Sequence, residues 1–332
     1  MILGIPKETL SNESRVAAIP ATIKQYVSAG FSVVVESGAG NLSQISDQDY
    51  KQVGAEILSD AKQVYLESDL IVKVKEPQKS EYSLIKKDQM IFTFFHFAAE
   101  ESLLDAMIDS KCLAIAYETV QDKNNKLPLL IPMSEVAGRL AVINGAKCLE
   151  ENMGGKGKLI SGVSGVEPAN VLVLGGGIVG TNAAKLASGL GANVYILDIN
   201  HDNLRYLDDI MPSNVHTVYS NKHALVNLLP KIDLLIGAIL VVGAKAPKII
   251  NRELLSIMSP GSVVVDVSVD QGGCIETTKP TTHQNPTFIE ENITHYCVAN
   301  MPGAVPYTST VSLCNATFNY VKELADYGFD AF

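Results

Sequence analysis

The chain has 332 residues, of which 47% are hydrophobic and 19% charged, so its composition is that of a globular protein and not of a disordered one. This length suggests about two domains of ordinary size. Lysine and arginine number 26 against 36 acidic residues, which gives a net charge of −10. An acidic chain without a basic run argues against nucleic acid and against anionic membrane surfaces as partners.

The cysteines and the apolar runs indicate the compartment. No two cysteines form a C-x-x-C pair or show zinc-ligand spacing, which is typical of reduced thiols in the cytoplasm. The five are Cys112, Cys148, Cys274, Cys297 and Cys314. The first residues lack the features of a signal peptide, and the longest apolar run, residues 234–244, is too short to cross a bilayer as a helix. We expect a cytoplasmic protein.

Strand-like runs alternate with helical patterns over the first third of the chain. Short β-rich runs occupy residues 2–5, 31–36, 70–74, 90–95 and 113–116. Pro20 suits the first turn of a helix that continues to Ala29 and stops at Gly30, and residues 100–110 carry an apolar face. This alternation predicts a mostly parallel sheet with helices packed on it.

The alternation repeats after a long helix expected over residues 134–152. A glycine-rich stretch, residues 154–165, indicates a boundary. Strands are expected at residues 170–174, 194–197, 217–219, 234–236, 262–267 and 296–298. A break at residues 301–306 precedes a last helix, residues 309–326, which Gly328 ends. This helix comes too late to be another strand-helix unit, so we expect it to return to the first domain.

These patterns predict an α/β fold with two Rossmann-like domains. Each would be a doubly wound parallel sheet, and the two would be separated by a cleft and linked by long helices. The first domain would be discontinuous, with residues 1–133 and about 303–332. The second would comprise residues 134–302, including its linking helix.

The clearest motif is Gly175-Gly-Gly-Ile-Val-Gly180, a G-x-G-x-x-G run between a buried strand and a helix. Gly175 would permit the tight turn, Gly177 would let the backbone approach a pyrophosphate, and Gly180 would let the helix pack closely on the strand. The start of the helix adds N–H groups and a positive dipole end. The alternative is a glycine-rich turn that binds no ligand.

An acidic residue follows the next strand. Asp198 lies 18 residues after Gly180, where a carboxylate can accept hydrogen bonds from ribose hydroxyls and repel a 2′-phosphate. The second domain is therefore predicted to bind NAD in preference to NADP.

Polar residues follow several of the predicted strands, and the carboxyl ends of parallel strands meet at one edge of a sheet. Arg15 lies after the first strand, Lys73 and Lys75 close the third, His96 follows the fourth, and Asp270 follows a strand of the second domain. Together they suit a substrate that carries a carboxylate and a carbonyl group. Arg15 can bind the carboxylate in bidentate fashion, and Lys75 can polarise the carbonyl oxygen.

The remaining two groups suit proton transfer and orientation. His96 titrates near neutral pH, and Asp270 can hold a nitrogen, a water or the ribose. Each residue also has an ordinary interpretation: Arg15 as a solvated side chain, the lysines as edge-strand protection, His96 as a hydrogen-bonded core residue, and Asp270 as a turn residue. Their common placement favours the functional interpretation. The other histidines show no ligand spacing, so no metal site is expected, and Cys274 and Cys297 are interpreted as packing residues.

The chain resembles the L-alanine dehydrogenase family over nearly its whole length. The resemblance includes Asn12-Glu-Ser-Arg-Val-Ala17, Lys73-Val-Lys-Glu-Pro77 and Val269-Asp-Gln-Gly-Gly273. It also covers residues 4–8, 92–96, 116–120, 133–139, 175–180, 197–200, 243–248 and 298–302.

The resemblance implies a reversible reaction in which L-alanine, NAD⁺ and water give pyruvate, ammonium and NADH. It implies that Arg15 and Lys75 bind the substrate, that His96 is the acid/base and that Asp270 is the catalytic carboxylate. A hydride leaves Cα, water adds to the resulting iminium ion, and the carbinolamine collapses to pyruvate and ammonium. The cofactor-binding positions are Ser134, Gly175, Gly177, Ile178, Val179, Gly180, Asp198, Ser220, Leu240 and Met301.

The resemblance also implies a hexamer, in which the long helices link domains or subunits. Two features depart from the family pattern. Members usually continue for some tens of residues beyond residues 325–328, so we expect either a truncated form or a first domain that lacks this cover. Asn203 stands where the family often has a basic residue, which Arg205 could partly replace.

Three other functions stay open. The NAD-binding subunit of proton-translocating transhydrogenase is similar over residues 12–40, but it would need a membrane partner and would have no use for His96 with Asp270. Opine-type or saccharopine-type dehydrogenases would need a larger substrate pocket. A non-catalytic, truncated NAD-binding homologue is the alternative from outside the enzymes.

Overall fold

The computed structural model describes residues 1–97, 100–241 and 245–331, in two compact units. Unit 1 comprises Met1–Met133 and Gly303–Phe332, and unit 2 comprises Ser134–Pro302. The end of the apolar run at residues 234–244, part of the family motif at residues 243–248, and residue 332 lie outside the described residues. No helix in the described part of the chain is long and apolar enough to span a membrane.

The sheet of unit 1 has six parallel strands in the order β3-β2-β1-β4-β5-β6. The strands are β1 (Ile2–Ile5), β2 (Ser32–Glu36), β3 (Glu56–Leu58), β4 (Leu70–Val72), β5 (Met90–Thr93) and β6 (Leu113–Ala116). The helices are α1 (Pro20–Ser28), α2 (Asp47–Gln52), α3 (Ala61–Glu67), α4 (Glu101–Ser110) and α10 (Pro306–Tyr327).

Alternation along the strands of unit 1 divides its core between the two faces of the sheet. Leu3 and Ile5 of β1 share one buried cluster with residues of α1 and α10. Ile71 of β4 and Ile91 of β5 belong to a second cluster, with residues of α3 and α4. Because successive side chains of a strand point to opposite faces, the sheet is covered on both sides.

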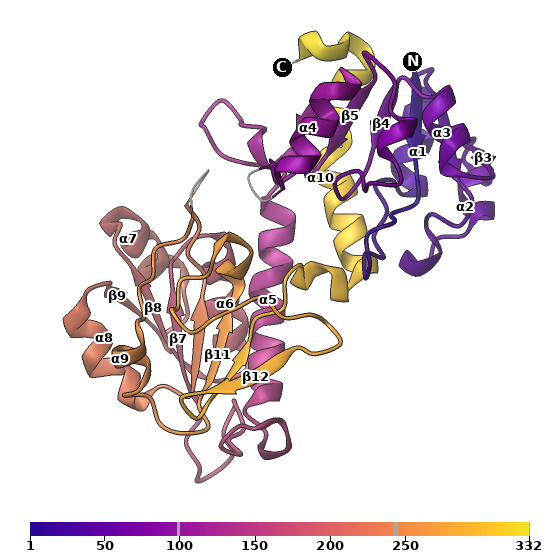
Figure 1. Ribbon diagram of the computed structural model, residues 1–332. Helices are drawn as coiled ribbons and strands as arrows, with labels where there is room; N and C mark the ends of the chain where they lie inside the picture. The colour runs from indigo at the N-terminus through magenta and orange to yellow at the C-terminus, as the bar shows by residue number, and fades with distance from the viewer. Residues whose placement is uncertain (98–99, 242–244, 332) are drawn as a thin grey trace. The chain divides into compact units, whose positions relative to one another are not determined.

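The last helix, α10, completes the core of unit 1. Its buried residues Leu313, Val321 and Leu324 join the cluster that contains Leu3 of the first strand. The Thr310 hydroxyl accepts a hydrogen bond from the backbone N–H of Val16, with an N–O distance of 3.1 Å. In Figure 1 the yellow α10 lies within the same unit as the indigo N-terminal elements. Segments almost 300 residues apart in sequence therefore share one core.

The sheet of unit 2 has the order β12-β13-β11-β10-β7-β8-β9, and only the edge strand β12 pairs antiparallel. The strands are β7 (Asn170–Leu174), β8 (Asn193–Asp198), β9 (Val215–Tyr219), β10 (Leu234–Gly237), β11 (Val263–Asp266), β12 (Thr287–Glu290) and β13 (Ile293–Tyr296). The helices are α5 (Ile131–Cys148), α6 (Ile178–Gly189), α7 (His201–Ile210), α8 (Lys222–Leu228) and α9 (Arg252–Leu255). The predicted α/β class with parallel sheets is confirmed.

Several predicted boundaries were wrong. The short edge strands β3 and β12 were not expected, and the strand expected at residues 296–298 is β13, three residues earlier. The long helix expected from Ser134 begins at Ile131, because Pro132 lies in its first turn, where proline is tolerated. The glycine-rich stretch at residues 154–165 lies inside unit 2 and is not a boundary.

Candidate functional site

Both sheets reverse their winding at one pair of strands. Counted from the first strand of each unit, the order is 3-2-1-4-5-6 in unit 1 and 3-2-1-4-5-7-6 in unit 2, so both contain the doubly wound core 3-2-1-4-5. The reversal falls between β1 and β4 in unit 1 and between β7 and β10 in unit 2. Ligands of such sheets bind beyond the carboxyl ends of the strands at this switch point. Arg15 and Lys75 follow β1 and β4, and the glycine run follows β7.

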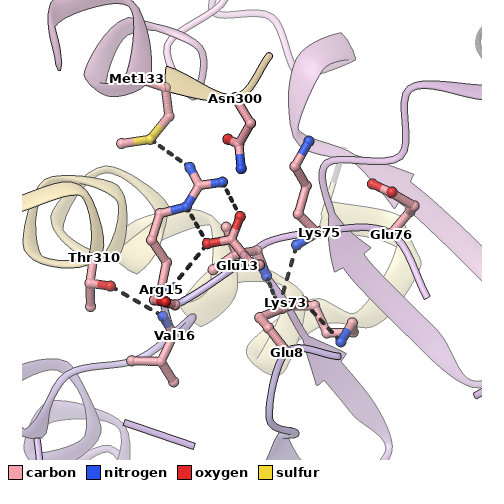
Figure 2. Close-up of polar contacts among 12 residues, drawn as sticks. Glu8, Glu13, Arg15, Val16, Lys73, Lys75, Glu76, Met133, Asn300 and Thr310 are labelled. Carbon is pink, nitrogen blue, oxygen red and sulfur yellow. Dashed lines mark hydrogen bonds and ion pairs between the residues drawn. The ribbon is translucent and has the colours of Figure 1, made fainter. Parts of the chain in front are cut away.

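Arg15 is buried and paired, so the interpretation of Arg15 as a solvated side chain was wrong (Figure 2). Its Nε donates to Oε1 of Glu13 at 2.7 Å, and its Nη2 donates to Oε2 of the same carboxylate at 2.5 Å. Its Nη1 donates to the Sδ atom of Met133 at 3.0 Å. A buried guanidinium needs such a counter-ion, because an unpaired charge away from water is costly.

Lys73 and Lys75 occupy different environments, although they are two residues apart. Lys73 is fully buried, and its Nζ lies 3.2 Å from Oε2 of Glu8 and 3.0 Å from Oε1 of Glu81. The backbone N–H of Val74 donates to Oε1 of Glu8 at 2.6 Å. Lys75 is only partly buried, and its N–H lies 3.4 Å from the same oxygen. Glu8 therefore fixes the backbone that carries Lys75.

The pKa values around Lys73 show opposing influences. Burial raises the pKa of the Glu8 carboxyl, although the Lys73 ammonium acts in the other direction. Burial also opposes the charged form of Lys73, but Glu8 and Glu81 outweigh it and leave the pKa of Lys73 raised. The cluster is thus a buried ion pair network, and Lys73 is a structural charge within it.

His96 is exposed, so the interpretation of His96 as a core histidine was wrong. Its backbone has a φ of 52°, in the left-handed region, and its N–H donates to Oε1 of Glu118 at 2.6 Å. The N–H of Phe95 donates to the same carboxylate. The ring of His96 is stacked parallel to that of Phe94, with centroids 5.7 Å apart. Glu118, which was not predicted, therefore holds the turn that presents His96 to solvent.

Two carboxylates at the end of β11 differ in their exposure. Asp266 is fully buried and accepts hydrogen bonds from the Thr278 hydroxyl at 2.7 Å and the Cys274 N–H at 3.0 Å. Burial raises the pKa of the Asp266 carboxyl despite these bonds. Asp270 is exposed on the short 3₁₀ helix η7 (Val267–Gln271), with Oδ2 3.5 Å from the N–H of Asn300. Asp266 holds the turn, and Asp270 faces solvent.

The glycine run has the geometry that a dinucleotide site requires. Gly175 has a φ of +100°, a backbone conformation that is strained for any residue with a side chain. A Cβ on Gly180 would lie 1.8 Å from the carbonyl oxygen of Gly175 and 3.1 Å from the Val173 side chain. A Cβ on Gly177 would meet nothing within 4 Å among the described atoms. The turn and the helix packing are therefore tight, whereas the backbone at Gly177 can be approached.

Asp198 is tied to this glycine run. Its Oδ2 accepts hydrogen bonds from the Gly176 N–H at 2.8 Å and from the Asn203 side chain at 3.0 Å. Its Oδ1 accepts one from the Asn200 N–H at 2.8 Å. Asn203 also donates to the Gly176 carbonyl at 3.0 Å. Asn203 thus links Asp198 to the glycine run, a role that its position in the sequence did not indicate.

The other expected cofactor positions lie at strand and helix ends of unit 2. The Ser220 N–H donates to the carbonyl of Asp198 at 2.9 Å, and Leu240 is exposed after β10. Ser134 is half-buried on α5, and Met301 is buried on the 3₁₀ helix η8 (Met301–Ala304). Ile178 and Val179 form the first turn of α6.

The cysteines and histidines offer no second centre in the described part of the chain. All five cysteines are free, and burial raises the pKa of the Cys297 thiol to about 12 and that of Cys274 further. These two thiols therefore stay protonated and act as packing residues. His295 is buried between Thr277 and the Ile293 carbonyl. No group of three or more metal-ligating side chains was found among the described residues.

Two family models match the chain. The model described as "Alanine dehydrogenase/PNT, N-terminal domain" matches residues 4–137, and "Alanine dehydrogenase/PNT, C-terminal domain" matches residues 141–332. The chain is 52% identical over 330 residues to an alanine dehydrogenase of Methanococcus maripaludis, covering 99% of this chain and 88% of that protein.

Solved structures show the same similarity. An L-alanine dehydrogenase superposes with a TM-score of 0.96 at 48% identity, over 100% of this chain and 91% of that one. A transhydrogenase from Sinorhizobium meliloti superposes with a TM-score of 0.85 at 26% identity, over 98% of this chain and 95% of that one.

The tight packing at Gly180 predicts a substitution effect. Gly180→Ala would force its Cβ against the carbonyl of Gly175 and displace the glycine run. We expect NADH binding, measured by fluorescence titration, to weaken at least about tenfold, and thermal stability to fall. Gly189→Ala in the same helix is the matched control, because its Cβ meets nothing within 4 Å. Equal NADH affinity in the two variants would show that the glycine run does not depend on this contact.

The buried network predicts a pH-dependent stability defect. Lys73→Met would leave Glu8 and Glu81 without their cation, at a cost of about 3–5 kcal/mol in the free energy of unfolding. The folded variant should then bind more protons than the unfolded chain, so its stability falls as pH rises. In urea unfolding, the deficit relative to wild type should be larger at about pH 8 than at about pH 5. A deficit that does not change with pH would contradict this account.

Proposed function

The chain belongs to the alanine dehydrogenase/PNT family, and we propose that it is an NAD-dependent L-alanine dehydrogenase. It would catalyse the reversible oxidative deamination of L-alanine to pyruvate and ammonium. The observation that carries this proposal is its similarity, over the whole chain and at about half of all positions, to proteins named alanine dehydrogenase. The placement of Arg15 and Lys75 after β1 and β4 supports it independently.

Unit 1 is proposed to bind the substrate. Arg15 supplies a rigid guanidinium for the carboxylate of alanine or pyruvate. Lys75 supplies a positive charge at the end of the neighbouring strand, suited to the carbonyl oxygen of pyruvate. Two cations from adjacent strands can hold a small 2-oxo acid in a single orientation, and orientation lowers the barrier of a two-reactant step.

Proton transfer is assigned to His96, and Asp270 is assigned as the second catalytic group. The imidazole of His96 is exposed at the end of β5 and can take the proton of the attacking water. In the reverse direction the same group returns that proton. Asp270 is an exposed carboxylate at the end of β11 and can accept hydrogen bonds from the substrate nitrogen or from water.

Unit 2 is proposed to bind NAD, and the geometry of its first strand-helix turn fits this cofactor. Gly175, Gly177 and Gly180, with the first turn of α6 at Ile178 and Val179, would receive the pyrophosphate. Asp198 would accept hydrogen bonds from the ribose hydroxyls and repel the additional phosphate of NADP. Ser134, Ser220, Leu240 and Met301 are proposed as further contacts. When bound, the nicotinamide accepts a hydride from the substrate or returns it.

The second candidate function is that of a transhydrogenase NAD-binding subunit. The structural similarity to a transhydrogenase favours it, but its TM-score and identity are lower than those of the alanine dehydrogenase match. A subunit that only binds NAD would have no need for His96 together with Asp270, both of which are exposed here at strand ends. This comparison favours the dehydrogenase.

A cytoplasmic homo-oligomer, a hexamer by resemblance, completes the proposal. Five free cysteines suit a reducing compartment.

The activity is tested by following NADH formation in the absorbance of the reduced nicotinamide. We expect turnover with L-alanine and NAD⁺ and little or none with NADP⁺, because Asp198 repels a 2′-phosphate. D-alanine, glycine and L-lysine serve as substrate controls. NADH binding without turnover of L-alanine would favour the transhydrogenase-type or non-catalytic alternatives, and equal use of NADP⁺ would contradict the role of Asp198.

Substitution of His96 tests its assigned role. Because its backbone is left-handed, His96→Asn is the suitable variant, since asparagine tolerates this conformation. We expect kcat to fall about 10²- to 10⁴-fold, with an unchanged dissociation constant for NADH. His223→Asn, at an exposed helix position bonded to Asn227, is the matched control. A variant that retains kcat would exclude His96 as the acid/base.

A further inference from the structure

We propose that Glu13 is the positioning residue for Arg15, holding one edge of its guanidinium so that the other edge receives the carboxylate of the substrate. This inference rests on the proposed function and deepens it. It assigns a role to a residue that acts by holding Arg15.

The hydrogen bonds define which edge Glu13 occupies. The Nε and Nη2 atoms form one side of the guanidinium, and both donate to the Glu13 carboxylate in a bidentate arrangement. The backbone N–H of Arg15 donates to Oε1 of the same carboxylate at 3.0 Å. One carboxylate, two residues away in sequence, thus fixes the backbone, the side-chain torsions and the plane of the guanidinium. A carboxylate ligand would then approach the remaining edge, formed by Nη1 and Nη2.

One contact at that remaining edge is to a weak acceptor. Nη1 donates to the Sδ atom of Met133 at 3.0 Å (Figure 2). A thioether sulfur is a weak acceptor, whereas a carboxylate forms a charge-assisted hydrogen bond of about twice the ordinary strength. A substrate carboxylate can therefore replace this contact at little cost.

Because both side chains are buried, Arg15 and Glu13 depend on each other as counter-ions. The side chains of Arg15 and Glu13 are 2% and 0% exposed. Removal of Glu13 would leave a buried guanidinium without its counter-ion, free to turn toward any other acceptor. Arg15 then offers the substrate hydrogen bonds in a fixed direction, and Lys75 adds a second positive charge.

A second carboxylate holds the backbone that carries Lys75. Glu8 accepts the backbone N–H groups of Val74 and Lys75 and lies close enough to Glu13 for the latter to contribute to its raised pKa. The loops after β1 and β4 are thus each held by hydrogen bonds to a buried glutamate, Glu13 and Glu8 respectively. The two carboxylates are close enough for their negative charges to interact.

The test compares Glu13→Gln, Glu13→Asp and a control, Glu36→Gln. Glutamine keeps the shape but replaces one acceptor oxygen by a donor, so it cannot receive both guanidinium bonds. Aspartate keeps the charge with one methylene less. Glu36 is a partly buried carboxylate of the same unit that accepts the Lys7 N–H. For each protein we would measure kcat, KM for pyruvate and L-alanine, thermal unfolding, NADH affinity, and pyruvate binding by calorimetry with NAD⁺ present.

We expect Glu13→Gln to raise KM and the dissociation constant for pyruvate by about tenfold or more, because the guanidinium is no longer held in line. The kcat value should change less, NADH affinity should be unchanged, and Glu13→Asp should recover part of the loss. Glu36→Gln should leave the kinetic constants unchanged. If Glu13→Gln lowers only thermal stability and leaves pyruvate binding and KM at the wild-type values, Glu13 is not a positioning residue.

Pyruvate binding separates this inference from the proposed function. A wild-type protein that binds pyruvate without turnover would overturn the proposed activity, yet weaker binding by Glu13→Gln would still support the role of Glu13. A wild-type protein that fails to bind pyruvate would overturn both, because Arg15 would then have no carboxylate to receive.

Discussion

The constraint on which the rest of the structure depends is the reversal of winding in each parallel sheet. Helices that follow successive strands cover one face, and after the reversal they cover the other. At the reversal the loops after two adjacent strands therefore separate to opposite faces. In unit 1 these loops follow β1 and β4, and in unit 2 they follow β7 and β10. The tight turn at Gly175 and the buried Arg15 lie in the segments that follow β7 and β1.

The two units place different kinds of residue at their switch points. In unit 2 the switch point is occupied by glycines, because neither Gly175 nor Gly180 has room for a Cβ. Asp198 and Asn203 stabilise this turn through hydrogen bonds to the glycine run. Unit 1 places cations there: Arg15 is paired with Glu13, and Glu8 accepts the backbone N–H of Lys75. Backbone N–H groups at a helix start suit a pyrophosphate, whereas a guanidinium and an ammonium suit a small carboxylate. A single topology thus offers two chemically different sites.

Much of the fold was predictable from the sequence, because buried parallel strands are short apolar runs between turn residues. The bounds of β1, β6 and β7 were predicted to the residue. The edge strands β3 and β12 were missed because they are short and partly polar, with Glu56 and Glu290 within them, whereas the edge strand β6 is apolar and was predicted. The start of α5 was misplaced because serine is favoured at helix N-caps, so Ser134 was interpreted as the first residue, whereas the helix already begins around Pro132.

The candidate residues were predictable as positions but not as environments. Placement after a strand indicated Arg15, Lys75, His96 and Asp270, and nothing in their spacing showed that the first is buried with Glu13 while the last two are exposed. Glu118 and Asp266 were missed because a carboxylate that accepts backbone N–H groups is recognisable only once the turn is built. A partner two residues away, as in Glu13-Ser-Arg15, was readable in principle, since the spacing lets the carboxylate reach both the backbone and the side chain of the arginine.

The distribution of exposure follows from what each group must do. A group that orients a ligand works best when its own torsions are fixed, and burial with a counter-ion fixes Arg15 through two side-chain bonds and one backbone bond. A group that exchanges protons must keep both of its protonation states accessible, and burial would penalise the charged one. His96 and Asp270, which are proposed as the acid/base and the second catalytic group, lie exposed on turns whose backbone N–H groups are bound by the half-buried Glu118 and the buried Asp266. A carboxylate that accepts backbone N–H groups therefore holds the segments of Arg15, His96 and Asp270 alike, and these three side chains differ in their exposure.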